Sequence, residues 1–575
     1  MDNIRFALLC AFGVVLFFLY QAWQADYGKQ QAPPAPEPVT AQRADTGVHD
    51  LPPVPQTEPE QKTDAAAQHP PPAQASLQPP PGGKTIQVFT DRLAVTIDLR
   101  GGDLRRVALL GVPVSSERPE SDLNLLSDTP PNFFIAQSGL ISPKRSAPDH
   151  GSPYTAPRTE YHLREGQDKL IVPLVWTAPD GRKVTKIYTF YRDSYRVGLR
   201  YEIENASGQP WTVSPYLRFW RTPYQHSGDM PFSSSFMGVG WYAAEPDEGG
   251  YSYATRALED LPSEPVAVTQ EGGWLAMVQH YFVAAVIPPP DRKVSYFAKP
   301  KPLSGFAAAA YGAGYVGAAH QIAPQQHAVI PAQLFLGPKL QDRLGQVAPG
   351  LELTVDYGIF TFLARPLYWV LEKLYALVGN WGWAIVLLTV IIKLIFYKLS
   401  ETQYRAMARM RKFAPRLQQI KEQYGDDRAK LQEKMMDLYK KEGFNPLGGC
   451  WPLLVQTPVF IALYWVLRAS VELRFADWIL WIDDLSAPDP YYILPCLLGV
   501  IMFIQQRLSA SSMTMEPMQQ RMMQIMPIGM AVFFAFFPVG LVLYYVTNSL
   551  LSIAQQWYIY RKLDNEGLGH HAGAK

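Results

Sequence analysis

The stretch WGWAIVLLTVIIKLIFYK (381–398) decides the fold class of this chain. It is an almost unbroken apolar run, close to the length that a membrane-spanning helix needs, and it contains a single internal lysine, Lys393. Further apolar runs follow it, at about 451–470, 491–506 and 525–560. Because the last run is long enough for two spans, the sequence predicts an α-helical core of five membrane helices within residues 359–563.

A sixth apolar run, from Phe6 to Tyr20, follows Arg5 near the N-terminus. This arrangement fits either a cleaved signal peptide or an uncleaved anchor, but the bulky Trp23 after the run makes a poor cleavage site. We therefore predict a transmembrane signal-anchor over residues 1–25, which brings the expected number of membrane helices to six. Residues 26–83 are rich in proline and poor in aliphatic clusters, so we expect an extended linker there.

The composition changes again from Lys84 to about Gly358. Segments rich in β-branched and aromatic residues, such as LAVTIDLR (93–100) and AQLFLG (332–337), alternate with Gly, Pro, Asn and Asp. This texture predicts a large mostly-β domain over residues 84–358, most simply a sandwich.

The overall charge and the scarcity of reactive residues exclude several classes of protein. The 52 basic side chains nearly cancel the 51 acidic ones, which argues against nucleic-acid specificity. Three cysteines, Cys10, Cys450 and Cys496, are too few for a disulfide scaffold and lack metal-ligand spacing. The sequence also has no P-loop motif and no evident nucleophile triad. We expect no cofactor, no metal and no bond-making enzyme.

The loops between the apolar runs differ in charge and so predict the topology. Residues 398–450 carry twelve Lys or Arg against seven acids, whereas residues 471–490 carry only Arg474 against five acids. Basic loops remain in the cytoplasm, so the first loop is expected inside and the second outside. This orientation predicts that both termini, including the tail 564–575, are cytoplasmic and that the β domain is periplasmic.

Lys393 is the most informative residue of the spans. An ammonium in a membrane helix is costly unless it snorkels, pairs with an acid or faces water, and the six apolar runs contain no Asp or Glu. Snorkelling and a wet cavity open to the cytoplasm therefore remain as alternatives. Other polar residues within the runs favour the cavity; they are Thr389, Gln456, Gln505, Gln506, Tyr544, Tyr545, Asn548 and Ser549.

Two segments outside the spans have helical periodicity. Leucines and valines repeat over residues 367–377, which predicts a helix that lies flat at the outer membrane interface or packs against the β domain. A turn at Gly425, Asp426 and Asp427 separates two further helices and predicts a basic cytoplasmic hairpin within 398–447. The apolar stripes of the hairpin either bury each other or are available to other partners.

Several motifs of the last third occur together in one known family. They are NPLGGC (445–450), DPYYILP (489–495), EPMQQ (516–520) and FPVGLVLYY (537–545), together with Gln456 and the run from Trp381 through Lys393. In these motifs the chain resembles the YidC membrane protein insertases over about residues 360–563.

The resemblance implies a hydrophilic groove in the inner leaflet, with Lys393 at the position where the family usually has an arginine. Thr389, Tyr544 and Tyr545 correspond to other groove or substrate-contact positions. The anchor, linker and β domain match the Gram-negative form, which implies a periplasmic β-supersandwich similar to sugar-mutarotase folds. The expected groove and substrate-contact residues are Lys393, Thr389, Gln456, Gln506, Tyr544, Tyr545 and Phe533.

We therefore expect a multi-pass membrane protein insertase and chaperone of the cell inner membrane. The resemblance implies nascent membrane proteins, the Sec translocon, the ribosome (transiently) and membrane lipid as partners. Two other classes remain open from the residues alone: a small-solute transporter, and a membrane-tethered periplasmic carbohydrate-binding or -processing protein. A transporter predicts solute flux in vesicles, and the third class predicts loss of function when residues 84–350 are deleted.

Overall fold

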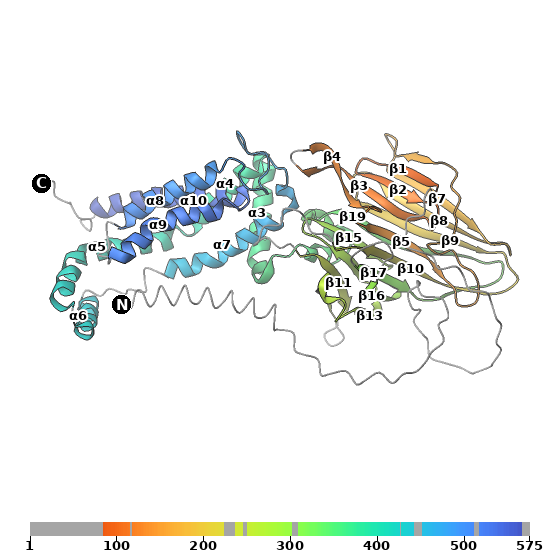
Figure 1. The fold of residues 1–575 in the computed structure, drawn as a ribbon, viewed down its shortest axis with the longest axis horizontal. Coiled ribbons are helices and arrows are strands. Elements are labelled where there is room, and N and C mark those ends of the chain that lie inside the picture. Colours follow the sequence, from red (N-terminus) through yellow and green to blue (C-terminus); the bar gives the residue numbers. More distant parts are fainter. Residues whose placement is uncertain are drawn as a thin grey trace. The chain divides into compact units, whose positions relative to one another are not determined.

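The computed structural model describes most of the chain from residue 84 onwards (Figure 1). The described residues are 84–115, 118–223, 236–244, 250–301, 309–425, 427–441, 451–510 and 517–565. The predicted anchor and linker, Asp426 and residues 566–575 of the tail lie outside them. So does the NPLGGC motif.

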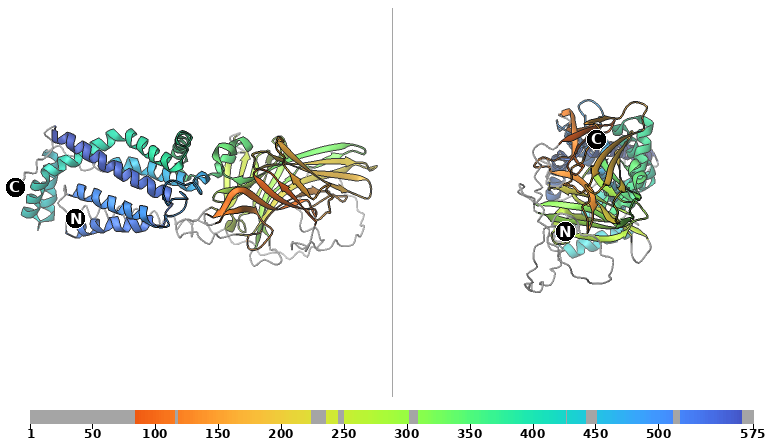
Figure 2. Two further views of the ribbon diagram at one scale, coloured as in Figure 1. Left: turned by 90° about the horizontal axis from the view of Figure 1, so that it is seen from above. Right: turned by 90° about the vertical axis from the view of Figure 1, so that its right-hand side faces the viewer.

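The middle of the chain forms two antiparallel-rich sheets, which Figure 2 shows from two further sides. The larger sheet has the strand order β13 (Val266–Glu271), β16 (Lys293–Lys301), β17 (Ala310–Gly317), β10 (Trp211–Arg221), β5 (Phe134–Ile141), β3 (Asp103–Ser115), β2 (Leu93–Asp98), β1 (Thr85–Phe89) and β6 (Glu160–His162), with β18 (His320–Ile322) on β10 and β4 (Arg118–Leu126) on β3. The smaller sheet has the order β12 (Tyr251–Ala257), β11 (Gly238–Ala244), β14 (Trp274–Val278), β15 (Phe282–Ile287), β19 (His327–Pro338), β9 (Arg196–Asn205), β8 (Arg182–Tyr191) and β7 (Lys169–Thr177).

The alternation of side chains explains why these strands pair as they do. In β9 every second residue is buried, from Val197 to Asn205, while the intervening residues are only half-buried. Because successive side chains of a strand point to opposite faces, one face of β9 joins the core. β10 is buried along almost its whole length because both of its edges and both of its faces are covered. The predicted β-rich domain is confirmed; its identity as a supersandwich stays a prediction.

The C-terminal part is helical, and each predicted apolar run forms a helix. The helices are α2 (Gln341–Val347), α3 (Thr361–Val378), α4 (Trp381–Ile395), α5 (Tyr397–Tyr424), α6 (Arg428–Lys441), α7 (Trp451–Ala469), α8 (Ile493–Ala510), α9 (Pro517–Phe534) and α10 (Val539–Asn565). The last apolar run, expected to form two spans, divides between α9 and α10 at the FPVG segment (537–540). α10 is the central element of the core, since it contacts α4, α5, α7 and α8.

No single helix among the described residues is both long and apolar enough to cross a bilayer by itself. α4 and the adjoining segment Tyr397–Arg405 meet these requirements together, with a bend of 60° between them. Polar residues such as Gln456 in α7 and Gln505 in α8 reduce the hydropathy of the other helices. The count of six membrane helices therefore stays a prediction.

The loop between α7 and α8 fixes where α8 and α10 begin. The buried Asp489 accepts hydrogen bonds from the Leu494 backbone N–H (2.7 Å) and from Trp481 Nε1 (3.0 Å), so it caps the start of α8. Leu485 O accepts from the backbone N–H of Gly540 (2.8 Å), the second residue of α10. The DPYYILP motif is thus accounted for in part by the structure of this loop.

α3 corresponds to the predicted amphipathic segment. Leu371 is fully buried, and the helix packs against α4 and α7. Phe362, Trp369 and Leu377 remain largely exposed on the same helix. The helix therefore combines packing with an exposed apolar surface, and Leu377 of the predicted stripe belongs to the exposed part.

Candidate functional site

Lys393 lies on α4 and reaches across to α10. Its side chain is only 8% exposed. The ammonium donates a hydrogen bond to Ser552 Oγ (2.7 Å), and Ser552 Oγ donates in turn to the Asn548 carbonyl (2.7 Å). Gln555 Nε2 donates to the Lys393 carbonyl at 3.4 Å, a longer contact between the same two helices. In the described part of the chain no carboxylate lies within ion-pair distance of Lys393.

The first part of α5, at the base of the hairpin, also contacts this arrangement. Tyr404 of α5 is buried, and its hydroxyl donates to the Ser552 carbonyl (3.3 Å). We refer to Lys393, Tyr404, Asn548, Ser552 and Gln555 as the Lys393 cluster. Ser552 is its centre, because its hydroxyl holds the ammonium while its carbonyl holds Tyr404.

α10 presents a polar ladder, a row of polar side chains along one side of the helix. Tyr544, Asn548, Ser552 and Gln556 follow one another at intervals of four residues, which places them on one helical face. Four buried oxygens on this helix have no hydrogen-bond partner among the described residues: Tyr544 Oη, Asn548 Oδ1, Gln555 Oε1 and Gln556 Oε1. Buried polar atoms are normally satisfied by protein or by ordered water, so this face is typical of a hydrated interior.

The geometry bears on the two alternatives for Lys393. A snorkelling lysine extends its ammonium towards bulk water, whereas this ammonium is directed to a buried hydroxyl on a neighbouring helix. The arrangement favours the wet cavity.

The predicted residues Thr389 and Tyr544 are both buried, but each makes a different contact. Thr389 lies one helical turn before Lys393, and its hydroxyl donates to the Ile385 carbonyl of its own helix (2.7 Å). The Tyr544 hydroxyl faces Gln456 of α7 without a hydrogen bond of normal geometry. Tyr544 thus belongs to the polar ladder, whereas the Thr389 hydroxyl is engaged with its own backbone.

Tyr545 belongs to an aromatic cluster that adjoins Tyr544 of the polar ladder. Its ring lies 4.2 Å from that of Phe534 and 4.6 Å from that of Phe460, measured between centroids. Phe533 contacts Phe537 (4.6 Å) and is 45% exposed. These rings form an apolar surface at the α9–α10 junction. The remaining predicted residue, Gln506, is half-buried near the end of α8.

The predicted hairpin turn is where it was expected. Gly425 follows α5, and Asp427 begins α6 by accepting the Lys430 backbone N–H (3.2 Å) and pairing with the Lys430 ammonium (3.3 Å). A carboxylate at this position is favourable because it satisfies a free N–H group and the positive end of the helix dipole. Asp426 lies outside the described residues.

Sequence reasoning missed Ser552, Gln555, Gln556 and Tyr404. A usable signal existed for two of them, because Ser552 and Gln556 continue the four-residue spacing of Tyr544 and Asn548. No comparable signal identifies Tyr404, whose role depends on a contact between distant segments.

Comparisons with known proteins match both halves of the chain. A family model described as 60Kd inner membrane protein matches residues 373–566, and one described as YidC periplasmic domain matches residues 85–370. A membrane protein insertase YidC from Nitrosococcus oceani is 46% identical over 572 residues, covering 99% of this chain and 100% of the relative. Another, from Thioalkalivibrio sulfidiphilus, is 44% identical over 584 residues, covering 99% of this chain and 100% of the relative.

Two solved structures have a weaker likeness. One is an active YidC insertase with its first transmembrane domain resolved, which covers 83% of this chain and 93% of its own at 19% identity and a TM-score of 0.37. The other is a galactose mutarotase-related enzyme from Lactobacillus acidophilus, which covers 44% of this chain and 97% of its own at 10% identity and a TM-score of 0.28.

Proposed function

The chain belongs to the YidC family of membrane protein insertases, and from this premise we propose that it inserts its substrates through the polar interior between α4 and α10, with Lys393 as the receiving cation. Its relatives make it a membrane protein insertase of the inner membrane with a β-rich periplasmic domain. The residues that carry out insertion, the number of spans and the orientation belong to the proposal.

One observation carries the role of Lys393. The ammonium is buried and donates to a single hydroxyl, Ser552 Oγ, without a carboxylate at ion-pair distance among the described residues. An ammonium has three N–H donors, so this cation retains capacity for an incoming acid. A short acidic segment of a nascent protein supplies that acid, and the polar ladder reduces the cost of removing the segment from water.

No nucleotide is needed for the proposed reaction. Moving the substrate helix from water into lipid yields about 25 cal/mol for each Å² of apolar surface buried. For an acidic segment the membrane potential adds about 2.3 kcal/mol per charge per 100 mV. The insertase therefore lowers the barrier for a transfer that is already downhill and performs no bond-making step.

The substrate helix leaves along the aromatic surface at the α9–α10 junction. Phe533 is half-exposed there. Its ring packs against those of Phe534 and Phe537, and Tyr545 packs against Phe534. Aromatic rings offer a large apolar contact area without fixed polar requirements, which suits substrates of varied sequence.

The topology follows from the charges of the loops. We place both termini and the hairpin α5–α6 in the cytoplasm, the β domain in the periplasm, and six helices across the membrane. The hairpin is the first segment that a nascent chain or a ribosome reaches. Cooperation with the Sec translocon and chaperone activity in the bilayer complete the proposed set of partners, alongside membrane lipid.

The replacement of the usual arginine by lysine restricts what Lys393 does. A lysine keeps the positive charge but lacks the planar fork that binds a carboxylate with two parallel hydrogen bonds. We assign Lys393 an attracting role that depends on charge. A solute-transporter role is less well supported, because a coupled carrier normally needs membrane carboxylates, and the apolar runs contain none.

Protease protection of a newly made single-span substrate in membrane vesicles tests the proposal. The substrate is used in two forms, with an acidic or a neutral extracytoplasmic tail, and the chain as wild type or Lys393→Glu. Lys398→Glu is the matched control, because Lys398 lies at the start of α5 and is exposed. We expect Lys393→Glu to block the acidic tail selectively; equal insertion of both tails by this variant would show that charge at Lys393 is irrelevant.

A further inference from the structure

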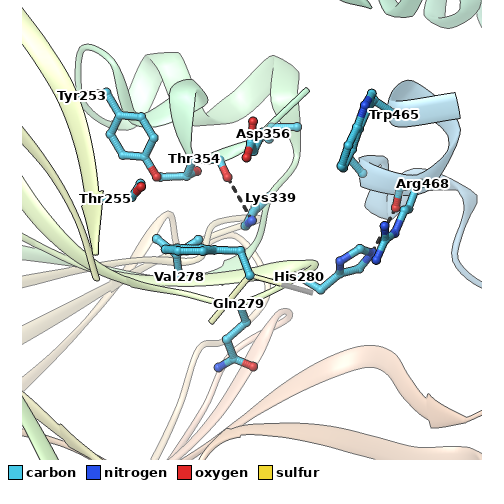
Figure 3. A pocket seen from close by; sticks show the side chains of 13 residues that line it. Tyr253, Thr255, Val278, Gln279, His280, Lys339, Thr354, Asp356, Trp465 and Arg468 are labelled. Carbon is cyan, nitrogen blue, oxygen red and sulfur yellow. Dashed lines mark hydrogen bonds between the residues drawn. The ribbon is translucent and has the colours of Figure 1, made fainter. Parts of the chain in front are cut away.

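A pocket of about 290 Å³ lies apart from the Lys393 cluster, between the β domain and the last turn of α7 (Figure 3). Figure 3 shows Lys339 in its middle, with Arg468 and His280 on one side, Thr255 on the other, and Asp356 near Lys339. Small-molecule pockets range upwards from roughly 300 Å³, so this pocket suits one small group and excludes a peptide or a helix.

Lys339 is the buried cation of the pocket. Its side chain is 5% exposed, and the ammonium donates to the Thr354 carbonyl (2.9 Å). Among the described residues no carboxylate lies within ion-pair distance of it, and the exposed Asp356 acts on it only from farther away. A buried ammonium satisfied by one carbonyl is expensive, because two N–H groups and the charge remain uncompensated. Burial accordingly lowers the pKa of Lys339 to about 7.

Positive charge on the opposite wall comes from α7. The Arg468 guanidinium lies 5.8 Å from the Trp465 ring and donates to the Tyr464 hydroxyl (3.2 Å). The Arg468 carbonyl lies 3.0 Å from His280 Nε2, which ties the β14–β15 turn to the end of α7. Lys339 and Arg468 therefore face the pocket from the β domain and from the helical core, against one carboxylate, Asp356.

We propose that this pocket binds a phosphate group, held between Lys339 and Arg468, and that in the cell the phosphate is that of a phospholipid headgroup. A phosphate oxygen accepts the remaining N–H groups of Lys339 and pairs with the Arg468 guanidinium, which is well suited to phosphate. Asp356 and Thr255 are placed to contact the polar alcohol attached to the phosphate.

A headgroup is favoured over free phosphate by the position of the pocket. Trp465 and Arg468 lie on the last turn of α7, and aromatic and cationic residues concentrate at the ends of membrane helices. This choice of source rests on the proposed topology, in which the end of α7 faces the periplasm. The bound phosphate itself does not depend on the insertion mechanism.

Native mass spectrometry of the full chain in detergent tests the proposal. Phosphatidylglycerol, phosphatidylethanolamine and phosphatidylcholine are titrated in turn, and inorganic phosphate and glycerol 3-phosphate serve as soluble competitors. The variants are Lys339→Gln, Arg468→Gln and the double variant. Arg292→Gln is the control, because Arg292 is an exposed cation of the β domain that does not line the pocket.

We expect wild type and Arg292→Gln to retain a lipid that each single variant binds about tenfold more weakly, the usual effect of losing one charged hydrogen bond. Competition by glycerol 3-phosphate supports a phosphate site. Arg468→Lys keeps the charge and should retain part of the affinity, which separates loss of binding from misfolding.

Equal lipid retention by wild type and a folded double variant would overturn the proposal. Binding of inorganic phosphate without any lipid would overturn the assignment to a headgroup. Insertion activity is measured separately, so that failure of the phosphate site is distinguished from failure of the proposed insertion function.

Discussion

Two buried lysines, one in the β domain and one in the helical core, have very different surroundings. Lys186 of β8 is fully buried and donates to the carbonyls of Gly101 (2.8 Å) and Ser138 (3.0 Å), with the carboxylate of Asp103 nearby. Its ammonium also lies 5.5 Å from the Tyr188 ring centre. Lys393, in contrast, has one serine hydroxyl and no nearby carboxylate in the described part of the chain.

This contrast distinguishes Lys186, a cation that stabilises the fold, from Lys393, the cation that we propose binds an acid of the substrate. Lys186 donates to two backbone carbonyls and has the buried Asp103 carboxylate close by, so its surroundings are provided by the folded domain itself. Lys393 is compensated only in part, so an acid from another molecule improves its surroundings. Burial alone is therefore a poor guide to function, and the number and kind of fixed partners distinguish the two lysines.

The largest effect is expected from removing the structural cation. Lys186→Met leaves the buried carbonyls of Gly101 and Ser138 without their donor and removes one of the cations near the buried Asp103, which should cost about 3–5 kcal/mol of stability. The thermal midpoint of the full chain, measured by tryptophan fluorescence, should fall by roughly 5–15 °C. Lys186→Met/Asp103→Asn should recover part of the loss, because removing both charges is cheaper than removing one. A thermal midpoint of Lys186→Met equal to that of wild type would contradict the structural role of Lys186.

The second effect concerns activity. Lys393→Met should leave the thermal midpoint nearly unchanged while reducing insertion of an acidic-tailed substrate about tenfold, the size of one lost charge-assisted contact. Protease protection measures the insertion. Lys393→Arg should restore it, because the attracting role depends on charge. A large fall in the midpoint of Lys393→Met would instead assign Lys393 a structural role like that of Lys186.

A smaller effect is expected at the serine that holds Lys393. Ser552→Ala removes the hydroxyl that accepts from the ammonium, a loss of about 1 kcal/mol that corresponds to a several-fold change in insertion. Ser549→Ala is the matched control, since Ser549 is buried on the same helix and lies outside the Lys393 cluster. Equal effects of the two substitutions on the protease-protection assay would contradict a specific role for Ser552.

The last effect concerns pH. Burial lowers the pKa of Lys339 to about 7, well below its ordinary value of 10.5, so between these values the unfolded chain binds a proton that the folded chain has released. Stability therefore rises with pH above about 7. Asp356, which raises this pKa, and Tyr253, His280 and Arg468 are the other charged or titratable groups of the pocket. Lys339→Met should flatten the dependence of the thermal midpoint on pH between 7 and 9; an unchanged slope would show that Lys339 is not its source.

Much of the architecture could be predicted because it depends on local patterns. The alternation in strands such as β9 and the long apolar runs of α4 and α10 are visible in the sequence itself. The hairpin turn was predictable as well, because Gly425 and Asp427 have the chemistry that a helix end and a helix start require. The order of the nineteen strands in the two sheets was not predictable, since it depends on contacts between distant segments.

The candidate site was predicted less completely, for a physical reason. Lys393 is conspicuous because a charge in an apolar run is rare, whereas the expected groove role of the buried Thr389 and Tyr544 stays a prediction. Ser552 is inconspicuous, because a serine in a membrane helix is common and becomes informative only when the α4–α10 contact is known. Tyr545 and Phe533 lie in an aromatic cluster apart from the ammonium, which the sequence did not indicate.

The bend between α4 and α5 gives the helical core a lever. From Tyr397, where α5 begins, Tyr404 is ~10 Å along the helix and Tyr424 is ~40 Å along it, at about 1.5 Å per residue. Tyr404 holds the Ser552 carbonyl, so a swing of the far end of α5 about the bend reaches Ser552 reduced about fourfold. In a rigid rotation about the bend, Tyr404 would move about a quarter as far as the hairpin turn, and Tyr404 contacts the same serine that holds the Lys393 ammonium. The short arm of this lever ends at the residue that joins the hairpin to the hydrogen-bond partner of Lys393.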